Sequence, residues 1–245
     1  MFSRLNSLGY LVTILFMFVA ILVGCKNDEA GSALVEPTLP FLEAPSVQPT
    51  IEMTPTPTPI LLGPLFDSGI DLMAKPIEVP IELQIPSLKV TAPVLGVGLT
   101  ENNVMDTPKG AVGDAIWHAA YWYRGSGIPG EPGTATIAGH VNDPLGVPEI
   151  FADLGDLDPG DQIIIHYSTL NIDIQFIVDQ VKVYSLEESS DPSVLVQIFG
   201  DGPIAGTSPQ PAPDGLSHLT LITCAGNIVN GQFDHHLVVY ATRSE

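Results

Sequence analysis

The chain has 245 residues and 45% hydrophobic content, which suits one compact domain with additional segments better than two full domains. Eight lysines and arginines stand against 28 aspartates and glutamates, for a formal net charge of −20. Nucleic-acid binding needs basic patches that neutralise phosphates, so this balance argues against a nucleic-acid partner and indicates an acidic, solvated surface.

The first 25 residues have the pattern of a membrane-targeting segment. Arg4 is followed by an uncharged, mostly apolar stretch that continues to Lys26, long enough for the core of a signal peptide or for a bilayer span. The stretch ends in "LVGC", which resembles a bacterial lipobox. We therefore expect residues 1–25 to be a lipoprotein-type signal peptide with lipidation at Cys25, or alternatively a single uncleaved transmembrane anchor. Both alternatives place the rest of the chain outside the cytoplasm, anchored to the cell membrane.

Residues 26–75 are rich in proline and threonine and include the run "TPTPTP". They lack a sustained hydrophobic period of 2 or 3.6, and this composition favours extended chain that builds no core. We expect a disordered, flexible linker here and a folded domain over residues 76–245.

The folded region has short runs rich in valine and isoleucine, separated by Gly, Pro, Asp and Asn, which is typical of an all-β domain with one or two short helices. Seven or eight strands at this spacing predict a sandwich or a small barrel. Helix-like openings occur in "VPEIFADLGDL" and in "DPSVLVQIF", where Asp191 and Pro192 form an N-cap and first-turn pair. In chain order, the predicted strands are two within 81–99 that Pro86 and Pro93 interrupt, then 133–141, 161–169, 172–186, "HLTLITC" and "HLVVYATR".

Cys224 closes the run "TLITC", and we expect a loop to begin directly after it. Strand alternation places Cys224 on the same face as Ile222, with Leu221 and Thr223 on the other face. If Cys25 is lipidated, Cys224 is a lone thiol in an oxidising compartment, where it is either buried or used. A catalytic cysteine needs a nearby base or cation, because the thiolate is the nucleophile.

His140 has a similar setting, since it follows a strand of small residues in "TIAGHV". His166, between apolar residues inside a predicted strand, is expected to be structural. The segments "TLITC", "TIAGHV" and "YRGSGIPGEPG" together resemble the sortases, and "PGEPGTATIAGH" is most similar to the class E and F type enzymes. The resemblance extends over about residues 76–245. It implies an eight-stranded sortase-type β-barrel in which Cys224 is the nucleophile and His140 the general acid and base.

The activity that this resemblance implies is that of a cysteine transpeptidase at the cell envelope. Cys224 would attack an LPXTG-like sorting signal of a secreted protein and form a thioester, and an amine acceptor, either a cell-wall peptide or another protein, would then take the acyl group. No cofactor and no metal are expected. The resting protonation state of the Cys224–His140 pair stays open at this point, as do the exact sorting motif and the acceptor.

Sortases also carry an arginine at or near the start of the final strand, and this chain departs from that pattern. The matching stretch is "FDHHLVVYA", which offers His235 and His236 instead. We expect His236 or His235 to take the donor role, followed by Arg243, which lies an odd seven residues beyond His236 and so faces the opposite side of a regular strand. Arg124, in a Gly-rich loop, ranks last. A neutral histidine donates one hydrogen bond where arginine offers five N–H groups, so a weaker or more pH-dependent enzyme is predicted.

Several alternatives remain at the sequence level. A zinc site of Cys224, His235 and His236 is disfavoured, because adjacent residues of a strand point to opposite faces. A papain-like enzyme would have its cysteine before its histidine, and the "SHGC"-like motif of other envelope transpeptidases is missing. Acidic residues near position 190 are more typical of a solvated loop than of a calcium site. The remaining alternative is a weak or inactive sortase-fold lipoprotein that acts as a binding module.

Overall fold

The computed structural model describes residues 71–73, 75–200 and 212–244. The predicted signal or anchor segment, its Cys25 and most of the predicted linker lie outside these residues. The described part begins slightly before the predicted boundary at 76, because the carbonyl of Leu72 accepts a hydrogen bond of 2.8 Å from the backbone N–H of Leu99. Within the described ranges, no helix is both long and apolar enough to cross a bilayer.

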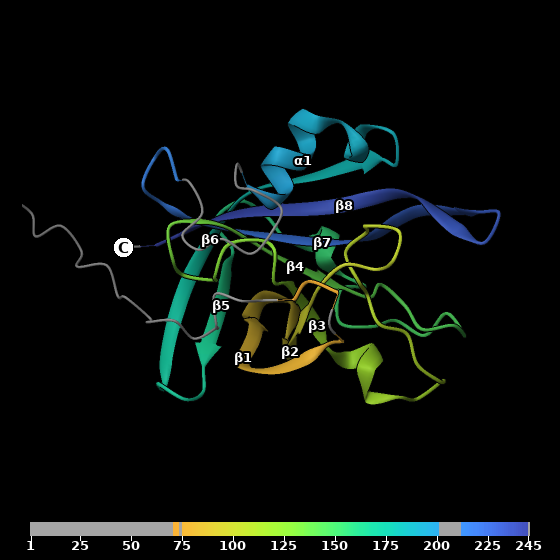
Figure 1. Cartoon of the computed structure of the whole chain (residues 1–245), viewed down its shortest axis with the longest axis horizontal. Helices are drawn as coiled ribbons and strands as arrows, with labels where there is room; N and C mark the ends of the chain where they lie inside the picture. Colours follow the sequence, from red (N-terminus) through yellow and green to blue (C-terminus); the bar gives the residue numbers. More distant parts are fainter. Residues whose placement is uncertain (1–70, 74, 201–211, 245) are drawn as a thin grey trace, which may run out of the picture. The chain divides into compact units, whose positions relative to one another are not determined.

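Eight strands close into one barrel in the order β1-β2-β3-β4-β7-β8-β6-β5 (Figure 1). This architecture confirms the predicted all-β barrel, which carries one α-helix and four short 3-10 turns. The strands are β1 (Ile77–Ile85), β2 (Val90–Val97), β3 (Ala120–Tyr123), β4 (Gly133–Gly139), β5 (Gln162–Tyr167), β6 (Ile172–Ser185), β7 (Ser217–Val229) and β8 (Gln232–Arg243), and the helices are η1 (Pro86–Leu88), η2 (Ala115–His118), η3 (Leu154–Asp156), η4 (Glu188–Ser190) and α1 (Pro192–Phe199).

The barrel interior is filled by the inward faces of these strands. Alternation explains which side chains point inward, since every second residue of a strand faces the core. In β7, Leu219 and Leu221 are fully buried in this core. In β6 the alternation holds at Phe176 and Val178 and then changes phase at a bulge, after which Val181 packs against the core. Val183, further along the strand, is more than half exposed.

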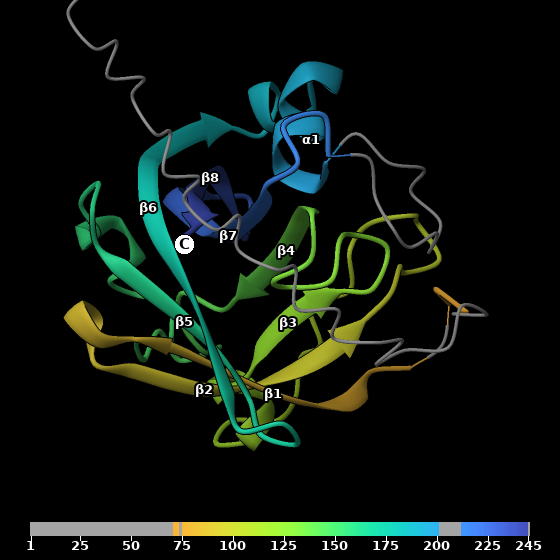
Figure 2. The same ribbon diagram turned by 90° about the vertical axis from the view of Figure 1, so that its left-hand side faces the viewer.

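Helix α1 lies beside β8 on the outside of the barrel (Figures 1 and 2). It begins as predicted, with the Asp191 carboxylate accepting a 2.8 Å hydrogen bond from the backbone N–H of Ser193 and Pro192 in the first turn. It is joined to β4 by the buried Thr136, whose hydroxyl donates to the carbonyl of Ile198 at 2.7 Å. The helix therefore packs against the outer face of β4.

Four details differ from the sequence-based expectations. Pro86 ends β1 as predicted, but Pro93 lies inside β2, opposite Glu82. The stretch 147–157 forms only η3 instead of a longer helix. Strand β3, four buried residues long, was not predicted. Finally, β7 does not end at Cys224 but continues to Val229, paired with β8.

Candidate active site

The parallel pairing of β4 with β7 brings His140 and Cys224 together. The register runs to Ala138 opposite Ile222, and the Thr223 hydroxyl then donates to the carbonyl of Gly139 at 2.8 Å. One step further in the same register places His140 beside Cys224, at the point where β4 ends and β7 continues alone on that side. An edge of β7 is thus left open next to the sulfur.

Both side chains point away from the barrel core. A Cβ on Gly139 would meet the ring of the buried Phe151, so position 139 faces inward and its neighbour His140 faces outward. In β7, Leu221 lies in the core, whereas Ile222 packs in a separate cluster outside it, and Cys224 shares that outer face. The predicted face assignment of "TLITC" is therefore confirmed.

Cys224 is an exposed, free cysteine. Surrounding protein nevertheless raises the pKa of its thiol, and the positive charge of Lys109 acts in the opposite direction. Because burial is the larger of the two effects, the group rests as a thiol near neutral pH. Activation therefore has to come from a neighbouring base.

His140 sits against the loop of residues 98–119, which connects β2 to β3. Its Nε2 lies 2.9 Å from the carbonyl oxygen of Pro108, and its ring packs against Trp117 and Tyr121 at centroid distances of 4.6 and 5.4 Å. Burial lowers the pKa of His140; the bond to Pro108 raises it, the charge of Lys109 lowers it and that of Glu149 raises it. The imidazole is consequently neutral near pH 7. Since a carbonyl only accepts, Nε2 carries the hydrogen, and Nδ1 keeps the lone pair of a base.

His236 stands directly opposite Cys224 in the antiparallel β7–β8 pair, on the same face. The Ser189 hydroxyl donates its hydrogen to the carbonyl of Leu186 at 3.1 Å, so it accepts from Nδ1 of His236 at 3.0 Å. Burial lowers the pKa of His236, which keeps the ring neutral near pH 7. Its Nε2 then carries a lone pair and no hydrogen, so His236 can donate to an oxyanion only after it is protonated.

The other predicted donors are not brought to Cys224. His235 pairs with Ala225, points to the opposite face from His236 and lies 2.6 Å from the carboxylate of Asp234. Arg243 lies seven residues further along β8, opposite Phe176, and donates to the carbonyl of Gly130 at 2.8 Å.

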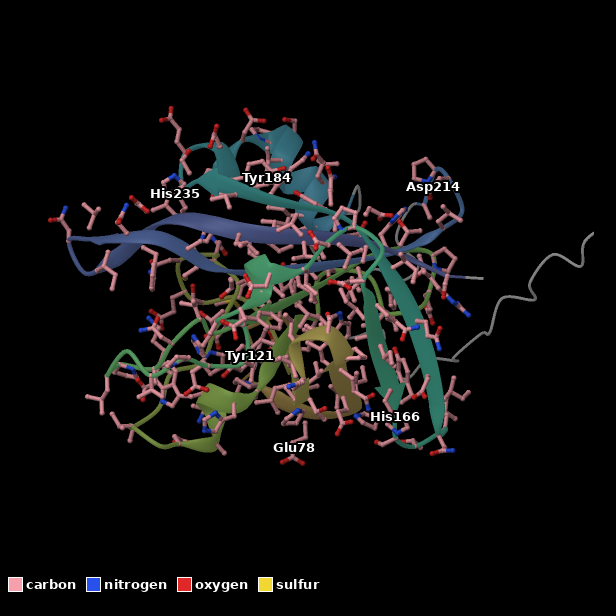
Figure 3. The ribbon with its side chains drawn as sticks, turned by 180° about the vertical axis from the view of Figure 1, so that it is seen from behind. Glu78, Tyr121, His166, Tyr184, Asp214 and His235 are labelled. Atoms are coloured by element: carbon pink, nitrogen blue, oxygen red, sulfur yellow. The ribbon has the colours of Figure 1, made fainter. Side chains whose placement is uncertain are left out.

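Figure 3 shows the separation of the two ends of the β7–β8 pair: His235 lies at one end and Asp214 at the other. Asp214 contacts His218, and His218 stands opposite Thr242, the neighbour of Arg243. Arg124 directly follows β3. The first residue of β3, Ala120, is paired with Gly139, and the strand runs away from His140 from there, so Arg124 also lies away from His140.

Sequence reasoning missed the contribution of loop 98–119. This loop supplies Pro108, Lys109 and Trp117 around His140, and β3 supplies Tyr121. No local pattern marks these residues as part of a site, because their placement depends on the short β3 strand. Among the described residues, no group of three or more His, Cys, Asp or Glu side chains is arranged to hold a metal ion.

Comparison with known proteins places the chain in a family. Three solved structures illustrate the similarity: a lid mutant of sortase A from Corynebacterium diphtheriae (21% identity, 70% of this chain and 73% of that chain covered, TM-score 0.47), a sortase D5 transpeptidase from Clostridium perfringens (19%, 67% and 78%, 0.44) and sortase C1 from Streptococcus suis (20%, 70% and 74%, 0.45). No curated protein sequence matches the chain. The family model of the sortase domain matches residues 83–244, well over half of the chain, which contains both His140 and Cys224. The chain therefore belongs to the sortase family of cysteine transpeptidases.

Proposed function

We propose that this protein cleaves an LPXTG-like sorting signal through a Cys224 thioester and transfers the acyl group to an amine acceptor at the cell envelope. The observation that supports the proposal is the register of β4 and β7, in which Gly139 and Thr223, the residues before His140 and Cys224, are joined by a hydrogen bond, with Cys224 a free, exposed thiol. Sortases as a family act on proteins that bear sorting signals and on amine acceptors, and they work outside the cytoplasm. A class E or F assignment, and anchoring through residues 1–25 with Cys25 as the lipidated residue, remain part of the proposal.

The chemistry can be written for the residues present. Nδ1 of His140 takes the proton of the Cys224 thiol, the sulfur bonds to the carbonyl carbon of the sorting signal, and the carbonyl π electrons move to its oxygen. As the tetrahedral intermediate collapses, the C–N bond breaks and the imidazolium returns the proton to the leaving amine. A thioester remains on Cys224.

The second half repeats these steps in reverse. An acceptor amine attacks the thioester carbon and gives its proton to Nδ1 of His140. The C–S bond then breaks, a new amide is released and the sulfur regains a proton. Both groups start neutral in this scheme, which agrees with the raised pKa of Cys224 and the lowered pKa of His140. The thiolate and the imidazolium then form only transiently, during the reaction.

The second candidate is a sortase-fold binding module with little or no catalysis. Two observations favour it: among the described residues, neither Arg124 nor Arg243 is brought to Cys224, and neutral His236 presents a lone pair instead of a donor. In this alternative the chain would still recognise a peptide at the outer face. It would not form a covalent bond to the peptide.

Mass spectrometry separates the two candidates. The full-length chain, kept in mild detergent, is incubated with a library of LPXTG-like peptides and triglycine. We expect an adduct whose mass equals the chain plus the amino-terminal peptide fragment minus one water, and a peptide ligated to triglycine. Both products should disappear in Cys224→Ala and His140→Gln.

His166→Gln serves as the matched control, because His166 bonds Asp173 on β5 and β6 at 2.7 Å and takes no part in the proposed chemistry. It should retain both products. If neither product forms although a soluble methanethiosulfonate labels Cys224 rapidly in the folded protein, the binding module is the better description.

A further inference from the structure

Basic side chains are few in this molecule, and their positions relative to the candidate active site differ. The described residues include six lysines and arginines against a strongly acidic background. Arg243 bonds a backbone carbonyl at the other end of β8, and Lys182 lies 5.7 Å above the ring of Tyr240. Lys109 follows Pro108, whose carbonyl contacts the ring of His140, and its positive charge lowers the pKa of Cys224 against the larger effect of burial.

The loop that carries Lys109 is held in place against the site. The carbonyl of Pro108, the preceding residue, is the hydrogen-bond acceptor of His140 at 2.9 Å. Upstream, the N–H of Asp106 donates to the carbonyl of Gly98 at 2.9 Å; downstream, the indole N–H of Trp117 donates to the carbonyl of Ala111 at 2.8 Å. Lys109 therefore extends from backbone whose position relative to His140 is determined on both sides.

From this arrangement we propose that Lys109 supplies the positive charge of the active site, with its ammonium facing the Cys224 sulfur and stabilising the thiolate that attacks the substrate. The inference rests on the proposed role of Cys224 as the nucleophile. Lys109 transfers no proton in this scheme. It acts as a positioning residue through its charge. Neutral His236 cannot supply such a charge, and the described arginines lie away from Cys224.

The other titratable groups around the sulfur do not offer an equivalent charge. His140 at the end of β4 and His236 on β8 are neutral near pH 7, because burial lowers the pKa of each. Glu149 has a carboxyl group and cannot supply a cation; its buried side chain lies 2.6 Å from His118 and raises the pKa of His140. Tyr121 stays neutral, since burial and nearby carboxylates raise its pKa. Lys109 is left as the basic side chain on the loop that contacts His140.

The test measures the thiol directly, without a substrate. The rate of Cys224 alkylation by iodoacetamide is followed from pH 6 to pH 11 in the full-length chain, in wild type, Lys109→Met, Lys109→Arg and Lys75→Met. Lys75 is the matched control, because it is an exposed lysine just before β1 and its loss changes the net charge equally. If Cys25 is present as a free thiol, a Cys25→Ala background removes its signal.

We expect Lys109→Met to shift the alkylation profile to higher pH, so that the rate at pH 7 falls roughly three- to tenfold, as is typical of one exposed charge acting across a partly solvated gap. Lys109→Arg should restore the wild-type profile, and Lys75→Met should leave it unchanged. High salt should reduce the difference between wild type and Lys109→Met, because it screens the lysine charge. Identical profiles for Lys109→Met and Lys75→Met would overturn the proposal.

This readout is independent of turnover. If wild type ligates no peptide, the proposed function fails, but the alkylation profiles still decide the role of Lys109. If wild type is active, Lys109→Met should lose acyl transfer by at least the same factor as its alkylation rate, and Lys109→Arg should keep it. Far-UV circular dichroism checks that the variants are folded.

Discussion

Replacing Thr223 with valine tests the bond that joins β7 to β4 between the two catalytic candidates. Valine has nearly the same shape as threonine but cannot donate to the carbonyl of Gly139, which accepts at 2.8 Å from the buried Thr223 hydroxyl. Removing one partner of a buried hydrogen bond costs about 1–2 kcal/mol when the other partner is left without a substitute. For a domain of this size that corresponds to a fall of about 2–8 °C in Tm.

Thr220 provides a control on the same strand. Its side chain is buried as well, but its hydroxyl has no hydrogen-bond partner in the part of the chain that the structure describes. Thr220→Val therefore removes a buried polar atom without breaking a bond, and we expect Tm to stay the same or to rise. The two variants make the same chemical change, but only Thr223→Val is expected to lower Tm.

The assay is thermal unfolding of the full-length chain, followed by circular dichroism, together with the rate of peptide ligation to triglycine. Thr223→Val should also slow ligation roughly tenfold or more, because a small shift of β7 against β4 separates the sulfur from Nδ1 of His140. Thr220→Val should not slow it. Equal Tm values for the two variants would refute the reasoning, since they would mean that the Thr223–Gly139 bond does not hold the strands together.

Three further outcomes follow from the site. The pKa of His140 is lowered and that of Cys224 is raised, so the ionised pair is a constant minor fraction at every pH between these two pKa values. The pH profile of kcat/KM should therefore have a plateau wider than the interval between the ordinary histidine and cysteine pKa values, and it should fall at lower pH as His140 is protonated and at higher pH as Cys224 ionises. A narrow pH optimum would contradict these shifts. His236→Arg places a permanent donor opposite Cys224 and should raise the ligation rate at neutral pH by about three- to tenfold, measured against wild type; a loss of rate would show that neutral His236 is itself required. Gly139→Ala would bring a Cβ within 2.4 Å of the Phe151 ring and should cost about 1–3 kcal/mol of stability, visible as a lower Tm, unless the buried ring can move aside.

Local patterns were sufficient for much of the barrel. The alternation of β6, the small residues of β4 and the valine-rich run of β8 each predicted a strand at nearly the observed place, and Asp191 with Pro192 marked the start of α1. These signals lie within a few neighbouring residues, so they can be recognised without knowledge of the fold. The face assignment of Cys224 was correct for the same reason, because side chains of a strand alternate.

Where the local signal conflicted with long-range pairing, prediction failed. Pro93 has no backbone N–H to donate, yet it sits in β2, whose neighbours on both sides determine the strand. Strand β3 has only four residues and exists through its pairing with β2 and β4. Cys224 was expected at a strand end because Gly226 follows, but β8 continues to pair with β7 beyond it, and Gly226 adopts a positive φ of 81° at the bulge.

The candidate site shows most clearly what the amino-acid sequence determines and what the tertiary structure determines. From the amino-acid sequence alone came the residue types of the chemistry, a cysteine and a histidine each expected at the end of a strand, and the family that uses such a pair. The tertiary structure decided their adjacency, because β4 and β7 are joined by a hydrogen bond between residues 84 positions apart. It also decided that the loop carrying Lys109 lies against His140, through the carbonyl of Pro108. Side-chain orientation is a local property of the backbone, whereas proximity between distant segments depends on the pairing of the whole sheet.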